Sequence, residues 1–171
     1  MQILSERSRA RSAWIAALAC SGVFICATAG AEPAQPAKAA PSGIEFHAKQ
    51  NAPPGMSLPF SEAVRVGGML YLSGEIGTDA GGKLVAGGIK AEAKQVMDNI
   101  GANLSRHGSS FDQVVQCTVA LTDIAEWPAF NEVYRGYFKQ HFPARMAFAA
   151  SGLALGARVE VQCNAATGEG R

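Results

Sequence analysis

Apolar residues recur at two different spacings along this chain, and each spacing predicts a different kind of element. Short apolar runs at 64–66 and 69–73 flank a glycine pair that tolerates a positive φ angle, so they predict a β-hairpin. A glycine-rich turn at 79–82 is followed by 83–86, which predicts one more short strand. Longer runs of apolar residues predict three further strands, at 114–121, 145–149 and 158–165.

Two segments instead carry apolar residues at helical spacing. The first begins at Ile89 and runs to about His107, where Gly108 provides the usual C-terminal cap. The second begins near Asp123, which can cap the first backbone amides, and it stops before Pro143. Its apolar stripe is rich in aromatic residues, which we interpret as core packing, and consists of Trp127, Phe130, Val133, Tyr134, Tyr137 and Phe138.

The order of these elements is strand, strand, strand, helix, strand, helix, strand, strand. It predicts an α+β fold in which two helices cover one face of a mixed sheet. The opposite face must then meet either water or another subunit. A chain in which 48% of the residues are hydrophobic favours a subunit, so we expect a homo-oligomer.

The first 31 residues have the three-part layout of a secretory signal peptide. Three arginines lie near the start, the stretch 14–27 is apolar and uncharged, and small residues at 29–31 suit a signal peptidase. A permanent membrane anchor and a lipoprotein signal are less favoured, because neither a basic stop-transfer cluster nor a convincing lipobox is present. We expect export to the periplasm or the medium, with a flexible leader at 32–45, one domain at 46–167 and a polar tail at 168–171.

Charge and cysteine content narrow the classes of function. Residues 1–31 hold three of the fifteen basic and one of the fourteen acidic side chains, so the remainder carries a net charge of −1. This balance, without a basic cluster, is not typical of nucleic-acid-binding proteins. Cys117 and Cys163 lie in separate predicted strands and could form a disulfide in an oxidising compartment, but our default expectation is two buried free thiols. The three histidines lack metal-ligand spacing, and we interpret them as surface residues.

Four polar residues are candidates for a site, and Arg145 is the strongest. It follows a proline-fixed exit from the second helix and precedes an apolar run, so a partly buried guanidinium there needs an anionic partner. Glu160 could supply that partner within the chain, which is the ordinary structural role of such a pair, or a ligand could supply it. Ser73 and Asn131 are the other two candidates; a strand-end hydroxyl and a helix-capping amide are equally good interpretations of them.

Several short motifs follow one another in a fixed order along the predicted domain. They are Asn51-Ala52-Pro53, Leu58-Pro59-Phe60-Ser61-Glu62-Ala63-Val64, Tyr71-Leu72-Ser73-Gly74-Glu75-Ile76, Asn131-Glu132-Val133-Tyr134, Phe142-Pro143-Ala144-Arg145 and Val159-Glu160-Val161. In this order and approximate spacing they resemble the RidA/YjgF family of imine-hydrolysing deaminases. The resemblance covers nearly the whole domain and is far more specific than any single motif.

The resemblance implies a chorismate-mutase-like homotrimer whose ligand sites lie in clefts between subunits. It implies that Arg145 binds the carboxylate of a 2-imino acid, or of its enamine tautomer, through two hydrogen bonds. Glu160 would direct a water molecule at the imine carbon and handle its proton, which gives a 2-keto acid and ammonia. Ser73 and Asn131 match polar positions of the family's site or of its supporting residues. Neither a metal nor an organic cofactor is implied.

The chain departs from the family's pattern at three positions. Phe60 stands where many deaminating members have Tyr, Ala147 where many have Cys, Ser or Thr, and Gln162 where a second strand acid is frequent. We therefore expect a less polar pocket, with Phe60 and Ala147 among its substrate-binding residues, which suits a different imine, a larger apolar side chain or a weak activity. The rival hypothesis is a trimeric binding protein that uses Arg145 to hold a small carboxylate metabolite without turnover. A ribonuclease activity, also attached to this family, fits poorly with the net charge of −1.

Overall fold

The computed structural model describes residues 43–50 and 58–168 of the chain. The predicted signal peptide, most of the predicted leader and the Asn51-Ala52-Pro53 motif lie outside these residues. The described residues all belong to one compact unit.

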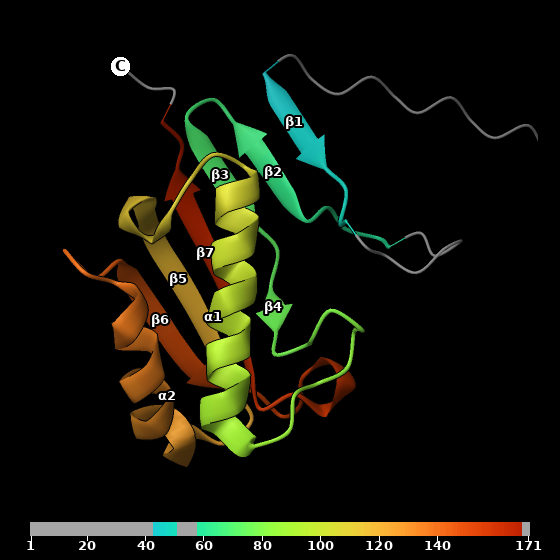
Figure 1. Cartoon of the computed structure of the whole chain (residues 1–171), viewed down its shortest axis with the longest axis vertical. Coiled ribbons are helices and arrows are strands. Elements are labelled where there is room, and N and C mark those ends of the chain that lie inside the picture. The colour runs from blue at the N-terminus through green and yellow to red at the C-terminus, as the bar shows by residue number, and fades with distance from the viewer. Residues whose placement is uncertain (1–42, 51–57, 169–171) are drawn as a thin grey trace, which may run out of the picture. The chain divides into compact units, whose positions relative to one another are not determined.

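Within the described residues, seven strands form one mixed sheet with the order β1–β2–β3–β7–β5–β6, and β4 also pairs with β7 (Figure 1). Every pairing is antiparallel except that of β5 with β6. The strands are β1 (Ile44–His47), β2 (Ala63–Val66), β3 (Met69–Leu72), β4 (Glu75–Ile76), β5 (Val114–Leu121), β6 (Ala144–Ala149) and β7 (Val159–Ala166).

Two helices, α1 (Gly88–Arg106) and α2 (Trp127–Tyr134), cover one face of this sheet, as the sequence predicts (Figure 1). Gly108, with a φ angle of 74°, follows α1 and lets the chain turn away. Asp123 accepts a backbone N–H and caps the short turn that leads into α2. Neither of the helices in the described residues is long and apolar enough to cross a membrane. Short 3₁₀ turns lie at Phe111–Gln113, Ile124–Glu126, Arg135–Tyr137 and Ala154–Gly156.

The hydrophobic core lies between the helices and the sheet. Along β7, the residues Val159, Val161, Cys163 and Ala165 alternate with polar residues, and all four are fully buried. Burying each larger apolar side chain in such a layer contributes about 1.5–3 kcal/mol relative to leaving it in water. The stripe of α1 that completes this layer consists of Ile89, Ala93, Val96, Met97, Ile100 and Leu104.

The opposite face of the sheet carries large apolar side chains that remain accessible in the single chain. Met146 and Phe148 of β6 are 56% and 44% exposed, and Tyr71 of β3 is similarly exposed. They alternate along their strands with residues that face the helices. Apolar groups gathered on one sheet face are typical of a surface that a partner subunit covers.

The hairpin, both helices and the strands β5, β6 and β7 confirm the predictions from the sequence. The predicted strand at 83–86 is wrong, because Leu84 makes only an isolated bridge with Thr78 beside the turn. The spacing of apolar residues also failed to indicate β4, which has two residues, and β1, which begins at Ile44 inside the segment expected to be a leader. Strands this short are defined by their pairing partners rather than by their own pattern.

The expectation of two free thiols is wrong, because Cys117 and Cys163 form a disulfide. The two residues lie directly opposite each other on the antiparallel strands β5 and β7, with their α-carbons 4.1 Å apart, and both are fully buried. Directly opposed residues have their side chains on the same face of a sheet, so the sulfur atoms meet. The bond joins two central strands within the core.

The expectation that all three histidines lie on the surface is wrong for His107. Its side chain is 8% exposed, and its Nε2 atom lies 3.1 Å from Oε1 of Glu62. The ring of His47 lies against it, with the two ring centroids 4.5 Å apart. His141 is exposed as expected. A contact between β1 and the end of α1 buries His107, and no local spacing in the sequence indicates such a contact.

Candidate active site

Arg145 lies at the start of β6, directly after the extended exit from α2. Pro143 disfavours helical geometry at the residue before it, so the chain turns from helix into strand at this point. Arg145 is level with Cys117 on the parallel strand β5, and its partly buried side chain points toward α2. The strand therefore holds the guanidinium between the sheet and the second helix.

Three side chains of α2 contact this guanidinium. Its Nη1 donates a hydrogen bond of 2.8 Å to Oδ1 of Asn131. Its central carbon lies 4.7 Å from the ring centroid of Tyr134 and 5.7 Å from that of Trp127. Both distances are within the range of a cation–π contact. Asn131 thus acts as an acceptor for Arg145 rather than as a helix cap.

A hollow of about 360 Å³ opens beside this cluster, and its lining residues come from α2, the following turn and the start of β6. A guanidinium has five N–H donors, and among the described residues Asn131 is the one side-chain or backbone acceptor that Arg145 meets. The remaining donors suit a planar anion such as a carboxylate, which can accept two parallel hydrogen bonds. The hollow is lined by Asn131, Tyr134, Arg135, Phe142, Pro143 and Arg145.

Tyr134 does not neutralise the charge of Arg145. Burial raises the pKa of the Tyr134 hydroxyl to about 12, although the nearby guanidinium acts in the opposite direction. The phenol is therefore neutral across the physiological pH range. Its hydroxyl is buried and meets no hydrogen-bond partner within residues 43–50 and 58–168.

Glu160 lies on β7 between two core residues, so its side chain faces the open side of the sheet, opposite to Arg145. The carboxylate lies directly against Gly74: a β-carbon at that position would be 2.1 Å from Oε1 of Glu160. Glycine at 74 therefore makes room for the acid. The internal ion pair between Arg145 and Glu160, which the residue types alone would favour, is not formed in the single chain.

Ser73 and Phe60 lie on segments next to Glu160. The hydroxyl of Ser73 donates a hydrogen bond of 2.6 Å to the backbone oxygen of Ser61, and this bond links the end of β3 to the approach to β2. Phe60, the neighbour of Ser61, is about half exposed. Phe60, Ser73 and Glu160 thus form a second group that is separate from Arg145 and Asn131, whereas Ala147 shares the helix-facing side of β6 with Arg145.

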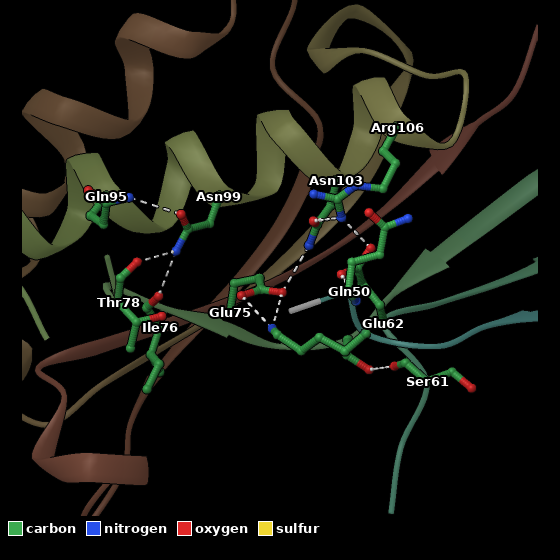
Figure 2. A network of polar contacts seen from close by, with 12 residues as sticks. Gln50, Ser61, Glu62, Glu75, Ile76, Thr78, Gln95, Asn99, Asn103 and Arg106 are labelled. Carbon is green, nitrogen blue, oxygen red and sulfur yellow. Dashed lines mark hydrogen bonds and ion pairs between the residues drawn. The ribbon is translucent and has the colours of Figure 1, made fainter. Parts of the chain in front are cut away.

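A polar network ties the second group to α1, and Figure 2 shows its two acids pointing toward the helix. Glu75, 5% exposed, accepts from Lys49 at 2.8 Å and from Asn103 at 2.9 Å. Glu62, 3% exposed, accepts from Arg106 and lies beside His107. The network fixes the strand residues that flank Ser73.

The carboxyl of Glu62 stays ionised within this network. Burial raises its pKa, but the hydrogen bonds from Arg106 and His107 outweigh the burial and hold the pKa below its usual value. Both acids of the network thus have their charges compensated inside the protein. We assign the network a structural role.

The structure therefore joins Arg145 to Asn131 by a hydrogen bond and places Ala147 on the same side of β6 as Arg145. Phe60, Ser73 and Glu160 lie on neighbouring segments elsewhere in the sheet. The interpretation of the sequence missed the contacts of Trp127 and Tyr134 with Arg145, because their apolar stripe was assigned to the core. The spacing of these two residues around Asn131, one turn in each direction, was the available signal: it places all three on one helix face.

Comparison with known proteins agrees with this fold. The family described as Endoribonuclease L-PSP matches residues 50–167. The human protein named 2-iminobutanoate/2-iminopropanoate deaminase is 44% identical over 116 residues, which cover 67% of this chain and 85% of the human one. The crystal structure of the yeast protein YEO7 superposes with a TM-score of 0.67 at 36% identity and covers 72% of this chain and 98% of its own.

A further solved structure bears the family's name. RidA from the Antarctic bacterium Psychrobacter sp. PAMC 21119 has a TM-score of 0.65 at 33% identity, with 71% of this chain and 98% of the other covered. The family match begins after β1 and extends through both helices to the last strand, β7. The chain therefore belongs to the RidA/YjgF family, the family described as Endoribonuclease L-PSP.

Proposed function

We propose that the chain is a hydrolase that converts 2-imino acids, or their enamine tautomers, to 2-keto acids and ammonia. The observation that carries the proposal is Arg145, whose guanidinium lines a hollow while most of its donors meet no acceptor within the described part of the chain. The human relative is named for the deamination of two such imino acids, which supports the same chemistry.

Binding of the substrate begins at its carboxylate. The planar fork of Arg145 can donate two parallel hydrogen bonds to the two carboxylate oxygens, which fixes the orientation of the molecule as well as its position. The imine carbon, adjacent to the carboxylate, is then held at a set distance from the guanidinium. Alignment of this kind is a large part of what a site contributes to hydrolysis of an already electrophilic carbon.

Hydrolysis adds one water molecule to the imine. The water oxygen bonds to the imine carbon and one water proton passes to the nitrogen, which gives a carbinolamine. The carbinolamine hydroxyl then gives up its proton and the nitrogen gains one as the carbon–nitrogen bond breaks, so that a keto group and ammonia remain. One imino acid and one water thus give one 2-keto acid and one ammonia. Glu160 takes the proton from the attacking water and returns it to the departing nitrogen, as a general base and then a general acid.

A complete site needs two subunits, because Arg145 and Glu160 face opposite sides of one sheet. We infer a homotrimer in which Arg145 and Asn131 of one subunit oppose Glu160, Ser73 and Phe60 of the next. The exposed apolar side chains of Met146, Phe148 and Tyr71 support an interface on the open face. Phe60 would place an aromatic ring, rather than a hydroxyl, beside the substrate's side chain.

Export to the periplasm or the medium is part of the proposal. The layout of residues 1–31 is that of a cleavable signal peptide. The buried disulfide between Cys117 and Cys163 supports an oxidising destination, because structural disulfides are rare in the cytosol.

The activity is tested with imines that an amino-acid oxidase generates in situ from several amino acids, in the presence of purified residues 32–171. We expect the protein to accelerate release of 2-keto acid and ammonia above the spontaneous rate. Arg145→Ala and Glu160→Gln should remove the acceleration, whereas Lys139→Ala, which removes an exposed cation that is not among the lining residues of the hollow, should keep it. A wild-type rate equal to the spontaneous rate with every imine would favour a carboxylate-binding protein instead.

The shared site is tested by mixing two inactive variants. Subunits that carry Arg145→Ala keep Glu160, and subunits that carry Glu160→Gln keep Arg145. Random reassembly of a 1:1 mixture into cyclic trimers should restore about a quarter of the wild-type activity, because one interface in four pairs the two intact residues. If no activity returns although mixed trimers form, both residues act within one subunit and the interface model is wrong.

Export is tested by expressing the full chain in a Gram-negative bacterium and separating the periplasm from the cytosol. We expect the protein outside the cytosol with an N-terminus at Glu32. Intact full-length protein in the cytosol would contradict the export proposal without affecting the enzymatic one.

A further inference from the structure

The three α2 residues that contact Arg145 form a stripe along one face of the helix. Trp127, Asn131 and Tyr134 follow one another at intervals of four and three residues, which is the spacing of side chains stacked on consecutive turns. The stripe faces the first residues of β6, and Arg145 lies across it. The guanidinium of Arg145 therefore meets the amide of Asn131, which lies on the helix face between the rings of Trp127 and Tyr134.

This arrangement restricts the orientation of the guanidinium plane. Contact with an aromatic ring leaves the edge of a guanidinium available for hydrogen bonds, because the ring attracts the cation through its face. The bond from Nη1 to Asn131 uses one position of that edge and limits rotation of the group within its plane. The other N–H donors along the edge of the guanidinium are therefore held in a defined direction before any ligand binds. An unrestrained arginine would lose more rotational freedom on binding.

The buried hydroxyl of Tyr134 shows that the ring, and not the phenol, is the useful part. This hydroxyl has no hydrogen-bond partner among the residues that the structure describes, so it gains nothing from being there. The ring packs against Phe130 and Phe138 as well as against Arg145, with centroids 5.4 Å and 4.8 Å away.

We propose that Trp127 and Tyr134 are positioning residues of the carboxylate site: their rings hold the guanidinium of Arg145 in the plane in which it receives a 2-keto or 2-imino carboxylate. This inference rests on the proposed function of Arg145 and names two residues through which that arginine is made effective. Neither ring needs to touch the ligand.

The experiment measures the affinity for pyruvate, a 2-keto acid, by NMR titration of wild-type residues 32–171 and of variants. Tyr134→Leu, which removes the ring, should weaken pyruvate binding about tenfold, the size expected from loss of one partly desolvated cation–π contact. Tyr134→Phe, which keeps the ring, should bind within about twofold of the wild type. Trp127→Leu, at the more exposed and more distant ring, should weaken binding by a smaller factor and tests the same idea if Tyr134→Leu does not fold.

Two controls separate positioning from ordinary packing. Phe130→Leu removes a fully buried aromatic residue of the same helix that contacts Tyr134, and it should lower the melting temperature without changing the affinity for pyruvate. The second control repeats the Tyr134→Leu comparison in an Arg145→Lys background. An ammonium has no plane to orient, so the tenfold effect should shrink to less than about twofold there.

The proposal is overturned if Tyr134→Leu and Trp127→Leu bind pyruvate as tightly as the wild type, or if Phe130→Leu weakens binding as much as Tyr134→Leu does. It is also overturned if the effect of Tyr134→Leu is equally large in the Arg145→Lys background, because a purely structural loss would be additive. Failure of the wild type itself to bind pyruvate would instead remove the carboxylate site, and the proposed function with it. The two failures are therefore distinguished by the wild-type titration.

Discussion

The molecule contains two clusters of charged and polar side chains, and they differ in how their hydrogen bonds are used. At α1, the buried acids Glu62 and Glu75 are surrounded by donors from the same chain (Figure 2). At α2, the cation Arg145 has one acceptor among the described residues and lines an open hollow. The first cluster also lines a hollow, of about 300 Å³, but we call it closed because its acids meet donors of the same chain. We call the second cluster open because its guanidinium has donors to spare.

The difference separates structural charges from functional ones. Buried polar groups are almost always paired, so a cluster whose partners are all internal needs no ligand. A partly buried guanidinium that keeps unmatched donors stays favourable only if water or a ligand satisfies them. The segments that carry the two clusters are also held in place by different interactions. Ion pairs attach the strand residues Glu62 and Glu75 to their partners. The disulfide between Cys117 and Cys163 joins β7 to β5, the strand that pairs with β6 beside Arg145.

The largest effect on stability is expected from removal of that disulfide. Replacing Cys117 and Cys163 together by alanine should lower the free energy of unfolding by about 4 kcal/mol, because the bond closes a long loop in the unfolded chain. The two residues are 46 positions apart. Urea unfolding of the oxidised wild type and of the double variant measures the difference. A loss below about 1 kcal/mol would mean that the stability of strands β5, β6 and β7 does not depend on the bond.

The next effect concerns the closed cluster. Glu62→Ala should destabilise the fold by about 3 kcal/mol, the lower end for a broken buried pair, because Arg106 keeps partial access to water. Glu132→Ala is the matched control, since it removes an ion pair with Lys90 in which both side chains are mostly exposed, and its unfolding curve should coincide with that of the wild type. Equal unfolding curves for the two variants would show that burial of Glu62 is unimportant.

The opposite result is expected for the open cluster. Arg145→Ala should lower the free energy of unfolding by no more than about 2 kcal/mol, less than Glu62→Ala, because the loss of one hydrogen bond and two aromatic contacts is offset in part by removal of unmatched donors from a partly buried group. The same variant should lose the acceleration of imine hydrolysis. Thermal unfolding alongside the ammonia assay tests both statements. A large destabilisation would place Arg145 with the structural charges and erase the contrast.

The smallest effect is a pH dependence at the edge of the closed cluster. Burial and the neighbouring His107 lower the pKa of His47 below its ordinary value of 6.5, and Arg65 adds to the shift against the opposing effects of Glu45 and Glu62. The unfolded chain then binds a proton more readily than the folded one. The contribution is fully present above pH 6.5 and is lost as the pH falls toward the folded pKa.

Melting temperatures of the wild type and of His47→Phe between pH 8 and pH 5 measure this contribution. The decline on acidification should be shallower in the variant. Parallel declines would show that His47 titrates in the folded state as it does in the unfolded chain.

The sequence predicted the parts of the fold that repeat locally and missed those that depend on distant partners. The helix at Gly88–Arg106 and the strand at Val159–Ala166 have clear periods, and both were found. The pairing of Glu62 with Arg106 joins residues 44 positions apart, and no local pattern indicates it. The disulfide was missed for the same reason, because the register of two strands decides whether cysteines meet.

The candidate site was found in part. The motifs that resemble the RidA/YjgF family pointed to Arg145, Asn131 and Glu160, and the structure joins the first two directly. The separation of Arg145 from Glu160 follows from strand alternation, which assigns each residue to a face only once the neighbouring core residues are known. The part played by Tyr134 was hidden because an aromatic residue in an apolar stripe is usually a core residue.

Gly74 has a consequence for how this sequence can change over evolutionary time. Since a β-carbon there would lie 2.1 Å from Oε1 of Glu160, alanine at 74 is incompatible with the present placement of the glutamate side chain at 160. A lineage that loses the glycine must shorten or redirect the acid on the neighbouring strand. We therefore expect the two positions to vary together, and a relative with a larger residue at the first to hold the acid at the second in another orientation.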